Sequence, residues 1–230
     1  MKAILVAAFL LNVLFSTLNA AVTVSSFTST GYPLTVNYTT AGPLGWVHWG
    51  GTDTSPTAPG YDTMNGGAVF SNYTATGATP SAFFNDANLN FSWSNGTNVA
   101  VEPDASTGII ASADGFSVRF TLTPPVALKP LSVFVYANLF NTTMTLTATQ
   151  LSNGDVGTNF TSAAGAPIGY FRIDYTPTSL TDTLTIDLAK TASGGNIVLY
   201  GAALVPEPSK AMLFLMGAAL CLFKRRRNSK

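Results

Sequence analysis

Residues 115–125, GFSVRFTLTPP, decide the fold class because apolar and polar side chains alternate strictly along them. The side chains of the apolar face are those of Phe116, Val118, Phe120 and Leu122. A period of two residues is that of a β-strand, whose side chains point alternately to opposite faces. The stretch therefore predicts a strand with one face in a core and the other in solvent.

The same pattern recurs in two other segments, 142–150 (TTMTLTATQ) and 181–189 (TDTLTIDLA). Both place Met, Leu, Ile or Ala on one face and mostly threonine on the other, and threonine is common on pleated, half-exposed surfaces. Residues 131–139, LSVFVYANL, are apolar on both faces and predict a strand that is covered on both sides. Between the two ends of the chain no segment has a convincing helical period, so the chain is predicted to be all-β.

The predicted architecture is one domain, residues 21–204, folded as a two-sheet antiparallel sandwich of the jelly-roll type. The segment 50–66, which is rich in Gly, Pro, Thr and Asp, is predicted to be a long loop inside this domain. The predicted strands are 22–28, 34–40, 44–49, 67–71, 89–94, 98–102, 115–123, 130–137, 142–150, 168–175, 181–188 and 196–204.

The charges are distributed unevenly, although 11 basic and 11 acidic residues cancel over the whole chain. The domain holds ten of the acidic residues and only four of the basic ones, and the rest of the positive charge lies at the ends. Nucleic acids require clusters of Lys and Arg, so an acidic domain argues against a nucleic-acid partner. The single cysteine, Cys221, lies outside the domain, which excludes a disulfide within it.

Residues 1–20 have the layout of a secretory signal, with Lys2, an apolar run from Ala3 to Phe15 and a small-residue end at Ala20. The apolar run is shorter than the roughly 20 residues that span a bilayer. We therefore expect an N-terminal signal helix and an exported protein.

The C-terminal residues 205–230 combine a Pro-Glu-Pro motif, an apolar run at 211–223 and a basic cluster. The motif is Pro206, Glu207 and Pro208, and the cluster is Lys224, Arg225, Arg226 and Arg227. This arrangement resembles the PEP-CTERM sorting signal of Gram-negative bacteria. The resemblance implies a short transmembrane helix in the inner membrane, with the basic cluster in the cytoplasm. It also implies a partner of the exosortase type, which cuts near the motif and delivers the domain to the cell surface or extracellular matrix. A tail that stays as a permanent anchor remains an alternative.

Catalytic and metal-binding residues are sparse. His48 is the only histidine, so neither a Ser-His-Asp triad nor a zinc site is expected. Glu102 and Asp104 could act as a carboxylate pair on glycans, but a solvated strand end is the preferred interpretation. Calcium is a weaker expectation that rests on five aspartates in oxygen-rich segments. They are Asp53, Asp62, Asp86, Asp104 and Asp114.

Carbohydrate is the most plausible ligand, because sugar rings stack on aromatic side chains. The candidate residues are Trp46, His48, Trp49 and Trp93. In an extended strand, Trp46 and His48 point to one side, and Val47 and Trp49 to the other.

The segments WVHWGG, FSWSNGT, LSVFVYANLF and TLTIDLAKTASGGNIVLYGAAL resemble those of secreted galactose-binding-like β-sandwich modules. This resemblance implies a jelly roll found in glycan-related extracellular proteins, and it implies no catalytic residues. The sequence thus predicts a non-catalytic surface or matrix protein that binds polysaccharide. A purely structural matrix component and, less favoured, a glycan-active enzyme remain alternatives.

Overall fold

The computed structural model describes residues 21–27, 34–52, 55–66, 69–83, 89–163 and 169–207. The predicted signal helix, Asp53, Asp86, Pro208, the predicted helix 211–223 and the basic cluster lie outside the described residues. Among the helices of the described part, none has the length and apolar character needed to cross a membrane.

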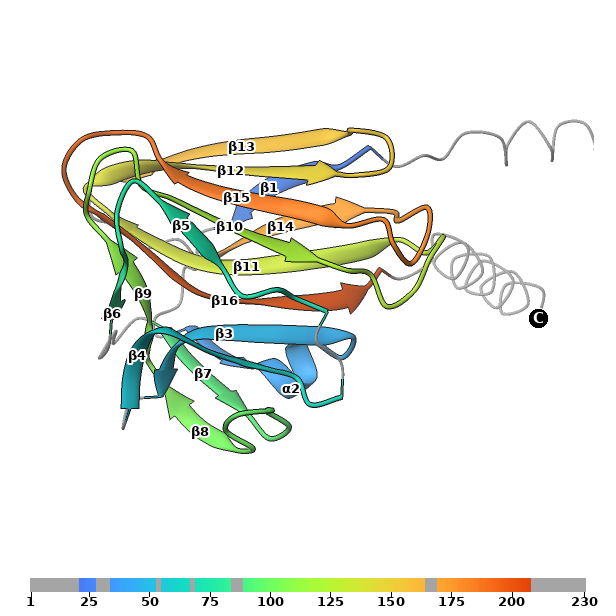
Figure 1. The fold of residues 1–230 in the computed structure, drawn as a ribbon, viewed down its shortest axis with the longest axis horizontal. Coiled ribbons are helices and arrows are strands. Elements are labelled where there is room, and N and C mark those ends of the chain that lie inside the picture. Colours follow the sequence, from blue (N-terminus) through green and yellow to red (C-terminus); the bar gives the residue numbers. More distant parts are fainter. Residues whose placement is uncertain are drawn as a thin grey trace, which may run out of the picture.

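The described chain forms three β-sheets (Figure 1). The central sheet has the order β1 (Thr23–Phe27), β14 (Tyr170–Tyr175), β11 (Leu131–Phe140), β16 (Asn196–Pro206), β3 (Gly45–Thr52) and β4 (Ser55–Thr63). In the same sheet β9 (Gly108–Ala111) pairs with β16, and β6 (Ser81–Phe83) pairs with β9. The five-stranded sheet has the order β13 (Val156–Ala163), β12 (Thr142–Gln150), β15 (Leu184–Lys190), β10 (Ser117–Leu122) and β5 (Thr74–Thr76). The three-stranded sheet has the order β2 (Leu34–Asn37), β7 (Leu89–Trp93) and β8 (Glu102–Ala105).

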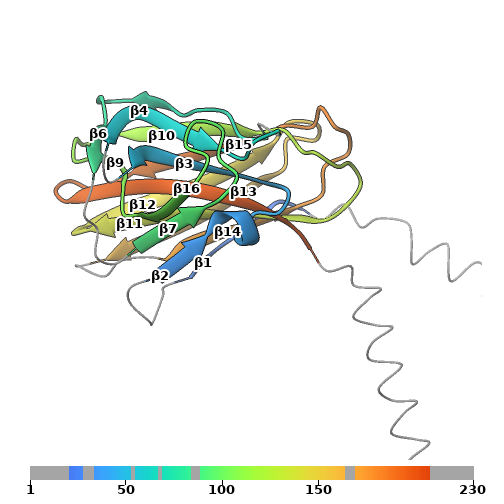
Figure 2. The ribbon, with the colours of Figure 1, turned by 90° about the horizontal axis from the view of Figure 1, so that it is seen from below.

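The central and five-stranded sheets face each other as a sandwich. Within the described residues, neighbouring strands of these two sheets pair antiparallel, as predicted. The prediction of only two sheets is wrong. A third layer consists of β2, β7 and β8, and β2 leads directly into α2 (Tyr38–Ala41), the one short helix of the described chain. Strands β2 and β7 of this layer pair in parallel. Figure 2, which views the molecule from the side of this layer, shows β2 and β7 in front of the central sheet.

The main core lies between the central and five-stranded sheets, and the predicted alternation places the apolar faces of β10, β12 and β15 in it. The side chains of these three strands in the core are those of Val118, Phe120, Leu122, Met144, Leu146, Ala148, Leu184, Ile186 and Leu188. Each is at most 1% exposed. This part of the sequence-based prediction is confirmed.

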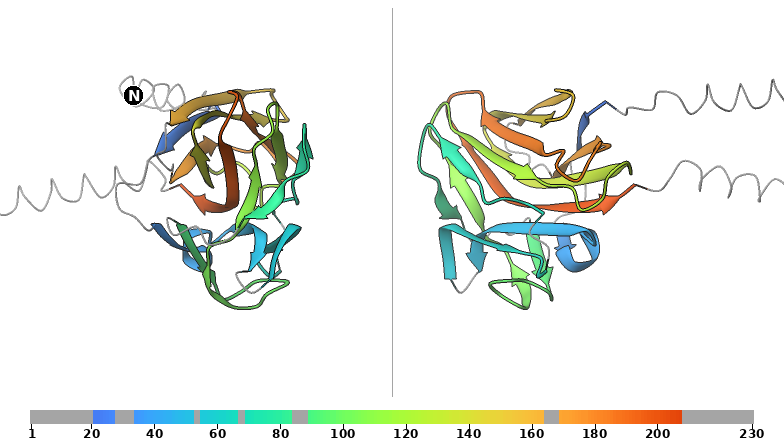
Figure 3. Two further views of the ribbon diagram at one scale, coloured as in Figure 1. Left: turned by 90° about the vertical axis from the view of Figure 1, so that its left-hand side faces the viewer. Right: turned by 45° about the vertical axis from the view of Figure 1, so that its right-hand side comes forward.

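A second core lies between the central sheet and the three-stranded sheet, as the end-on view of the layers in Figure 3 makes clear. Strand β11 contributes Val133 and Val135 to the main core and Tyr136 to the second one. The prediction that residues 131–139 form a strand covered on both sides is therefore confirmed, and its physical reason is the third layer.

The segment 50–66 is not the predicted loop, because β4 occupies residues 55–63 and pairs with β3. Strand β4 ends the strand order of the central sheet, and Pro56 and Pro59 are tolerated there because an edge strand need not donate every N–H. Strands β5, β6, β9 and β13 were also missed. The predicted strand 98–102 is wrong, because the chain bends at 97–100 and β8 begins only at Glu102.

An ion pair closes one end of the main core. The Nζ atom of Lys190 lies 2.5 Å from Oδ1 of Asp114, and the lysine side chain is 0% exposed whereas that of Asp114 is 65% exposed. A buried ammonium needs a partner, while an exposed carboxylate is solvated without one. The stability of this end of the domain therefore depends on the two residues unequally.

We expect Asp114→Ala to lower the free energy of unfolding by about 3 kcal/mol, because it leaves the buried ammonium without its carboxylate. Lys190→Met should cost less than about 1 kcal/mol, because it leaves only a solvated carboxylate. Urea unfolding of both variants measures the difference. Equal losses would show that the buried ammonium has other sufficient partners.

Candidate functional site

The four residues predicted to bind sugar are all in the interior. Strand β3 directs Trp46 and His48 to the second core and Val47 and Trp49 to the main core, which confirms the predicted alternation. The exposed fractions are 0% for Trp46, 1% for His48, 0% for Trp49 and 2% for Trp93. Stacking requires an open ring face, and none of these rings has one. The prediction that they form a sugar-binding surface is therefore corrected.

The second core explains why these residues occur where they do. The indole nitrogen of Trp46 donates to Oδ1 of Asn95 at 3.0 Å, and that of Trp93 donates to the carbonyl oxygen of Val99 at 2.7 Å. Both hydrogen bonds attach the segment after β7 to the aromatic rings beneath it. Buried tryptophans need such partners for their N–H groups, so the role of this pair is structural.

His48 is a neutral core residue. Its Nε2 atom lies 2.9 Å from the hydroxyl of Thr107, and that hydroxyl donates to the carbonyl oxygen of Gly51 at 2.7 Å. Because the single proton of the hydroxyl is used in this way, Nε2 carries the imidazole proton and donates it to Thr107. Burial among Tyr38, Phe91 and Trp93 lowers the pKa of His48 from 6.5 to about 3.

This pKa makes folding stability depend on pH. Below about pH 6.5 the unfolded chain binds a proton at His48, whereas the folded protein binds one only near pH 3. The free energy of unfolding therefore falls as the pH drops from about 6.5 to about 3. Between pH 6.5 and 4.5 the loss should be about 2 kcal/mol. We expect His48→Gln to flatten this part of the profile, measured by urea unfolding at a series of pH values. An unchanged slope would assign the acid sensitivity to other groups.

Of the five aspartates proposed for calcium, the structure describes Asp62, Asp104 and Asp114, and these three do not form a cluster. Asp62 is 5% exposed and already accepts four backbone N–H groups, from Thr63, Thr97, Asn98 and Val99, at 2.8–2.9 Å. Asp114 pairs with Lys190, and Asp104 is exposed on β8. Within the described ranges no three His, Cys, Asp or Glu side chains lie close enough to hold a metal ion.

Asp62 instead fastens the segment 97–99 to β4. We expect Asp62→Asn to lower the free energy of unfolding by about 2–4 kcal/mol, because an amide brings its own N–H groups to a site filled with donors and lacks the charge. The exposed Asp104→Asn is the matched control and should change little. Thermal and urea unfolding measure both, and equal effects would contradict the proposed role of Asp62.

Glu102 and Asp104 lie at a strand end, as the preferred interpretation predicted. The Oε1 atom of Glu102 accepts the backbone N–H of Asp104 at 3.3 Å, and the Asp104 side chain is exposed. Neither residue lines the half-open cavity of about 170 Å³ between β6, β9 and the start of β16. This arrangement is that of a local turn contact, and it offers no second wall for a sugar.

A different group of aromatic residues reaches the surface, on the outer face of β1, β14 and β11. We call Phe27, Phe134 and Tyr170 the aromatic face. Strand alternation places them there because Val24, Phe171 and Val135 on the same strands point into the main core. Phe27 is 41% exposed, and the other two rings are half-buried.

The rings of the aromatic face are in contact with one another. Phe27 stacks on Tyr170 with ring centroids 5.1 Å apart and planes 26° apart. Phe134 meets Tyr170 edge-on at 5.3 Å. The group continues inward through Tyr136, whose ring centroid is 6.3 Å from that of Tyr170. Apolar ring surface thus lies at the border between the second core and the solvent.

Charged groups lie directly beside these rings. Arg172 follows Tyr170 by two residues on β14 and pairs with Phe134 in the register of β11. Its Nε atom donates to Oδ1 of Asp174 at 2.7 Å and its Nη2 atom donates to Oε1 of Glu207 at 2.7 Å. The hydrogen bond with Asp174 is the main cause that raises the pKa of Arg172. The site thus combines apolar ring area, a fixed guanidinium and carboxylate oxygens.

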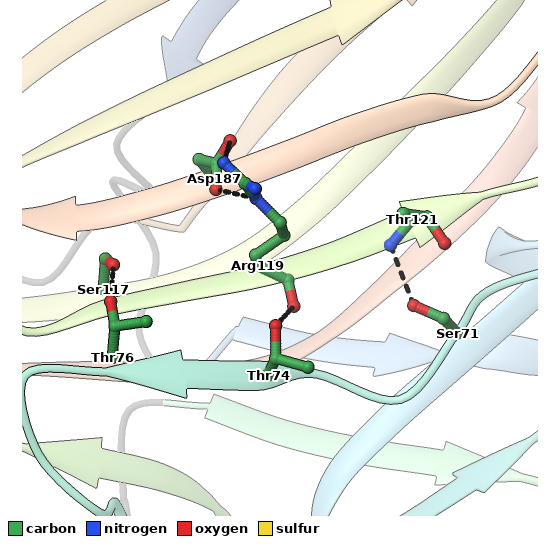
Figure 4. A network of polar contacts seen from close by, with 7 residues as sticks. All are labelled: Ser71, Thr74, Thr76, Ser117, Arg119, Thr121 and Asp187. Carbon is green, nitrogen blue, oxygen red and sulfur yellow. Dashed lines mark hydrogen bonds and ion pairs between the residues drawn. The ribbon is translucent and has the colours of Figure 1, made fainter. Parts of the chain in front are cut away.

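Polar side chains form a separate surface on the outer face of the five-stranded sheet (Figure 4). At its centre Arg119 forms two hydrogen bonds with Asp187, at 2.7 and 3.1 Å. Hydroxyl groups around this pair bond to one another and to the backbone, as in the contact of 2.6 Å between Thr76 and Ser117. The seven residues drawn in Figure 4 are all polar or charged, so the network shown there is built from hydroxyl, guanidinium and carboxylate groups.

Sequence reasoning missed the aromatic face, although a signal was present. In YFRIDY, residues 170–175, the odd positions are apolar or aromatic and the even ones are Tyr170, Arg172 and Asp174. That alternation predicts a strand whose outer face carries a ring, a cation and an anion. The contribution of Phe27 and Glu207 could not be found this way, because Phe27 belongs to β1 and Glu207 follows β16, both far from residues 170–175 in the sequence.

No protein family matches the chain, and no curated protein is significantly similar to it. Several solved structures are similar in architecture. They include the enzymatically active domain of bacteriophage CBA120 tailspike protein 4, with 12% identity and a TM-score of 0.37 over 61% of this chain and 20% of that one. They also include TmCBM61 in complex with β-1,4-galactotriose, with 8% identity and a TM-score of 0.37 over 61% and 90%. A third is the CBM22-1 xylan-binding domain from Paenibacillus barcinonensis Xyn10C, with 13% identity and a TM-score of 0.34 over 59% and 87%. At these values the likeness assigns no residue and no ligand to this chain.

Proposed function

We propose that the protein is an exported, non-catalytic surface or matrix protein that binds a neutral polysaccharide at the aromatic face. The observation that carries the proposal is that Tyr170, which stacks on Phe27, and the Arg172–Asp174 pair lie on the same face of β14. The central sheet contains the order β3-β16-β11-β14, and the five-stranded sheet contains the order β10-β15-β12-β13. Most of the neighbouring strands in these orders are not consecutive in the chain, which supports the jelly-roll interpretation.

The chemistry of the aromatic face suits a sugar. A pyranose has an apolar C–H face, which packs on a ring such as Phe27, and a rim of hydroxyl groups, which bond to guanidinium and carboxylate groups. A neutral polymer is favoured because Asp174 lies within the site and the domain carries an excess of acidic residues. Such a site needs no metal and no nucleophile.

We further propose that the chain beyond the domain is a sorting signal of the PEP-CTERM type, with an exosortase-like enzyme as partner and the inner membrane as a temporary location. Two features of the described residues are compatible with this role. First, β16 ends at Pro206, the first residue of the predicted motif. Second, the start and the end of the domain lie in one row of paired residues across the central sheet, namely Thr23, Asp174, Ser132 and Val205. Three strand spacings of about 4.8 Å place the two ends of the domain about 14 Å apart, at the same end of the sandwich.

The first experiment tests Tyr170→Ala and Phe27→Ala in the full chain by calorimetric titration with xylohexaose, cellohexaose and β-1,4-galactotriose. Each substitution removes ring area that a sugar would cover, so we expect about tenfold weaker binding of whichever oligosaccharide binds the unchanged protein. Unfolding curves of the variants exclude loss of the fold as the cause.

Arg119→Ala, on the outer face of the five-stranded sheet, is the matched control and should bind like the unchanged protein. If Arg119→Ala weakens binding and Tyr170→Ala does not, the site lies on that other face. If none of the three oligosaccharides, nor exopolysaccharide purified from the source organism, shows saturable binding, the proposed function is wrong and a purely structural role remains.

A further inference from the structure

Arg172 holds two carboxylates of different origin. Asp174 belongs to the same strand, whereas Glu207 is the residue that follows β16 at the end of the described chain. Asp174 accepts from Arg172 only through Nε, so β14 alone supplies no partner for Nη2. In the structure Glu207 is this partner.

Two hydrogen bonds hold Glu207 in place, and the hydroxyl of Ser132 lies near its carboxylate. Its backbone N–H donates to the carbonyl oxygen of Pro130 at 3.0 Å, and its Oε1 atom accepts from Arg172 at 2.7 Å and lies 3.1 Å from the hydroxyl of Ser132. The hydroxyl of Ser132 also lies 2.6 Å from Oδ1 of Asp174. A hydroxyl has one proton, so the two carboxylates compete for it and the shorter contact takes it.

We propose that Glu207 is an intramolecular occupant of the polysaccharide site and weakens ligand binding as long as it is bound to Arg172. This inference rests on the proposed function. A sugar hydroxyl that is to accept a hydrogen bond from Nη2 of Arg172 must first displace a charge-assisted bond to a carboxylate that is only 21% exposed. The cost of that displacement reduces the apparent affinity.

The position of Glu207 gives this contact a regulatory meaning. A cut of the chain on the N-terminal side of Glu207 removes the competing carboxylate and leaves Asp174 as the remaining acidic partner of Arg172. The uncut protein then binds polysaccharide weakly and the cut protein binds it strongly. Release of the tail and capture of the ligand are thereby coupled through Arg172.

The test uses the full chain, in which Glu207→Ala removes the carboxylate without any cut. Titration with the oligosaccharide that binds best is expected to show about fivefold to tenfold tighter binding than the unchanged protein. Glu207→Gln keeps the volume and one acceptor but not the charge, and should give a smaller gain. Glu102→Ala, which replaces the other glutamate of the chain, is the matched control and should leave the affinity unchanged.

Arg172→Ala distinguishes this mechanism from a general effect of charge. In an Arg172→Ala background, Glu207→Ala should no longer tighten binding, because the contact that it breaks is already absent. If Glu207→Ala binds no more tightly than the unchanged protein while Tyr170→Ala still weakens binding, the inference is overturned and the proposed function stands. If Tyr170→Ala also has no effect, the binding site itself has been placed wrongly.

Discussion

The packing of Tyr38 against five surrounding rings is the interaction on which the rest of the molecule depends. Its ring lies within 6.2 Å, centroid to centroid, of the rings of Trp46, His48, Phe91, Trp93 and Tyr136. Strands β2, β7 and β8 are only four or five residues long, and their sheet needs a partner that covers its apolar face. They are held on the central sheet by this aromatic core, and together with the five-stranded sheet on the other side they cover both faces of β11 and β16.

The extent of that third layer decides which aromatic residues are structural and which reach the solvent. Over β16 and β3 the layer covers Trp46, His48 and Tyr200, whose role is to pack. Toward β14 and β1 the aromatic series continues through Tyr136 and Tyr170 to Phe27, which is partly open. One continuous set of rings therefore serves first as a core and then, at its border, as a surface to which a ligand can bind.

Two carboxylates of the domain are held by several hydrogen bonds from the chain around them. Asp62 accepts backbone N–H groups, and Asp182 accepts from Gln150, Ser152 and Thr178. Burial raises the pKa of Asp182, but these hydrogen bonds outweigh it and bring the value to about 2. Glu207 differs, because its partner Arg172 also faces a candidate ligand site, and this double use connects the end of β16 with the aromatic face.

Alternation in the sequence determined the strands β10, β12 and β15, their buried faces and the two-sided burial of β11, because a strand turns successive side chains to opposite sides by local geometry alone. It also determined that Trp46 and Trp49 point apart. Only the tertiary structure decided what covers each side. The pairing of β2 with β7 joins Val36 to Phe91, and the contact of Arg172 with Glu207 joins residues 35 positions apart. Such long-range contacts depend on the order and stacking of the sheets, which no local period encodes. For that reason the tryptophans predicted to bind sugar are core residues, and the candidate site lies on a face assembled from three distant strands.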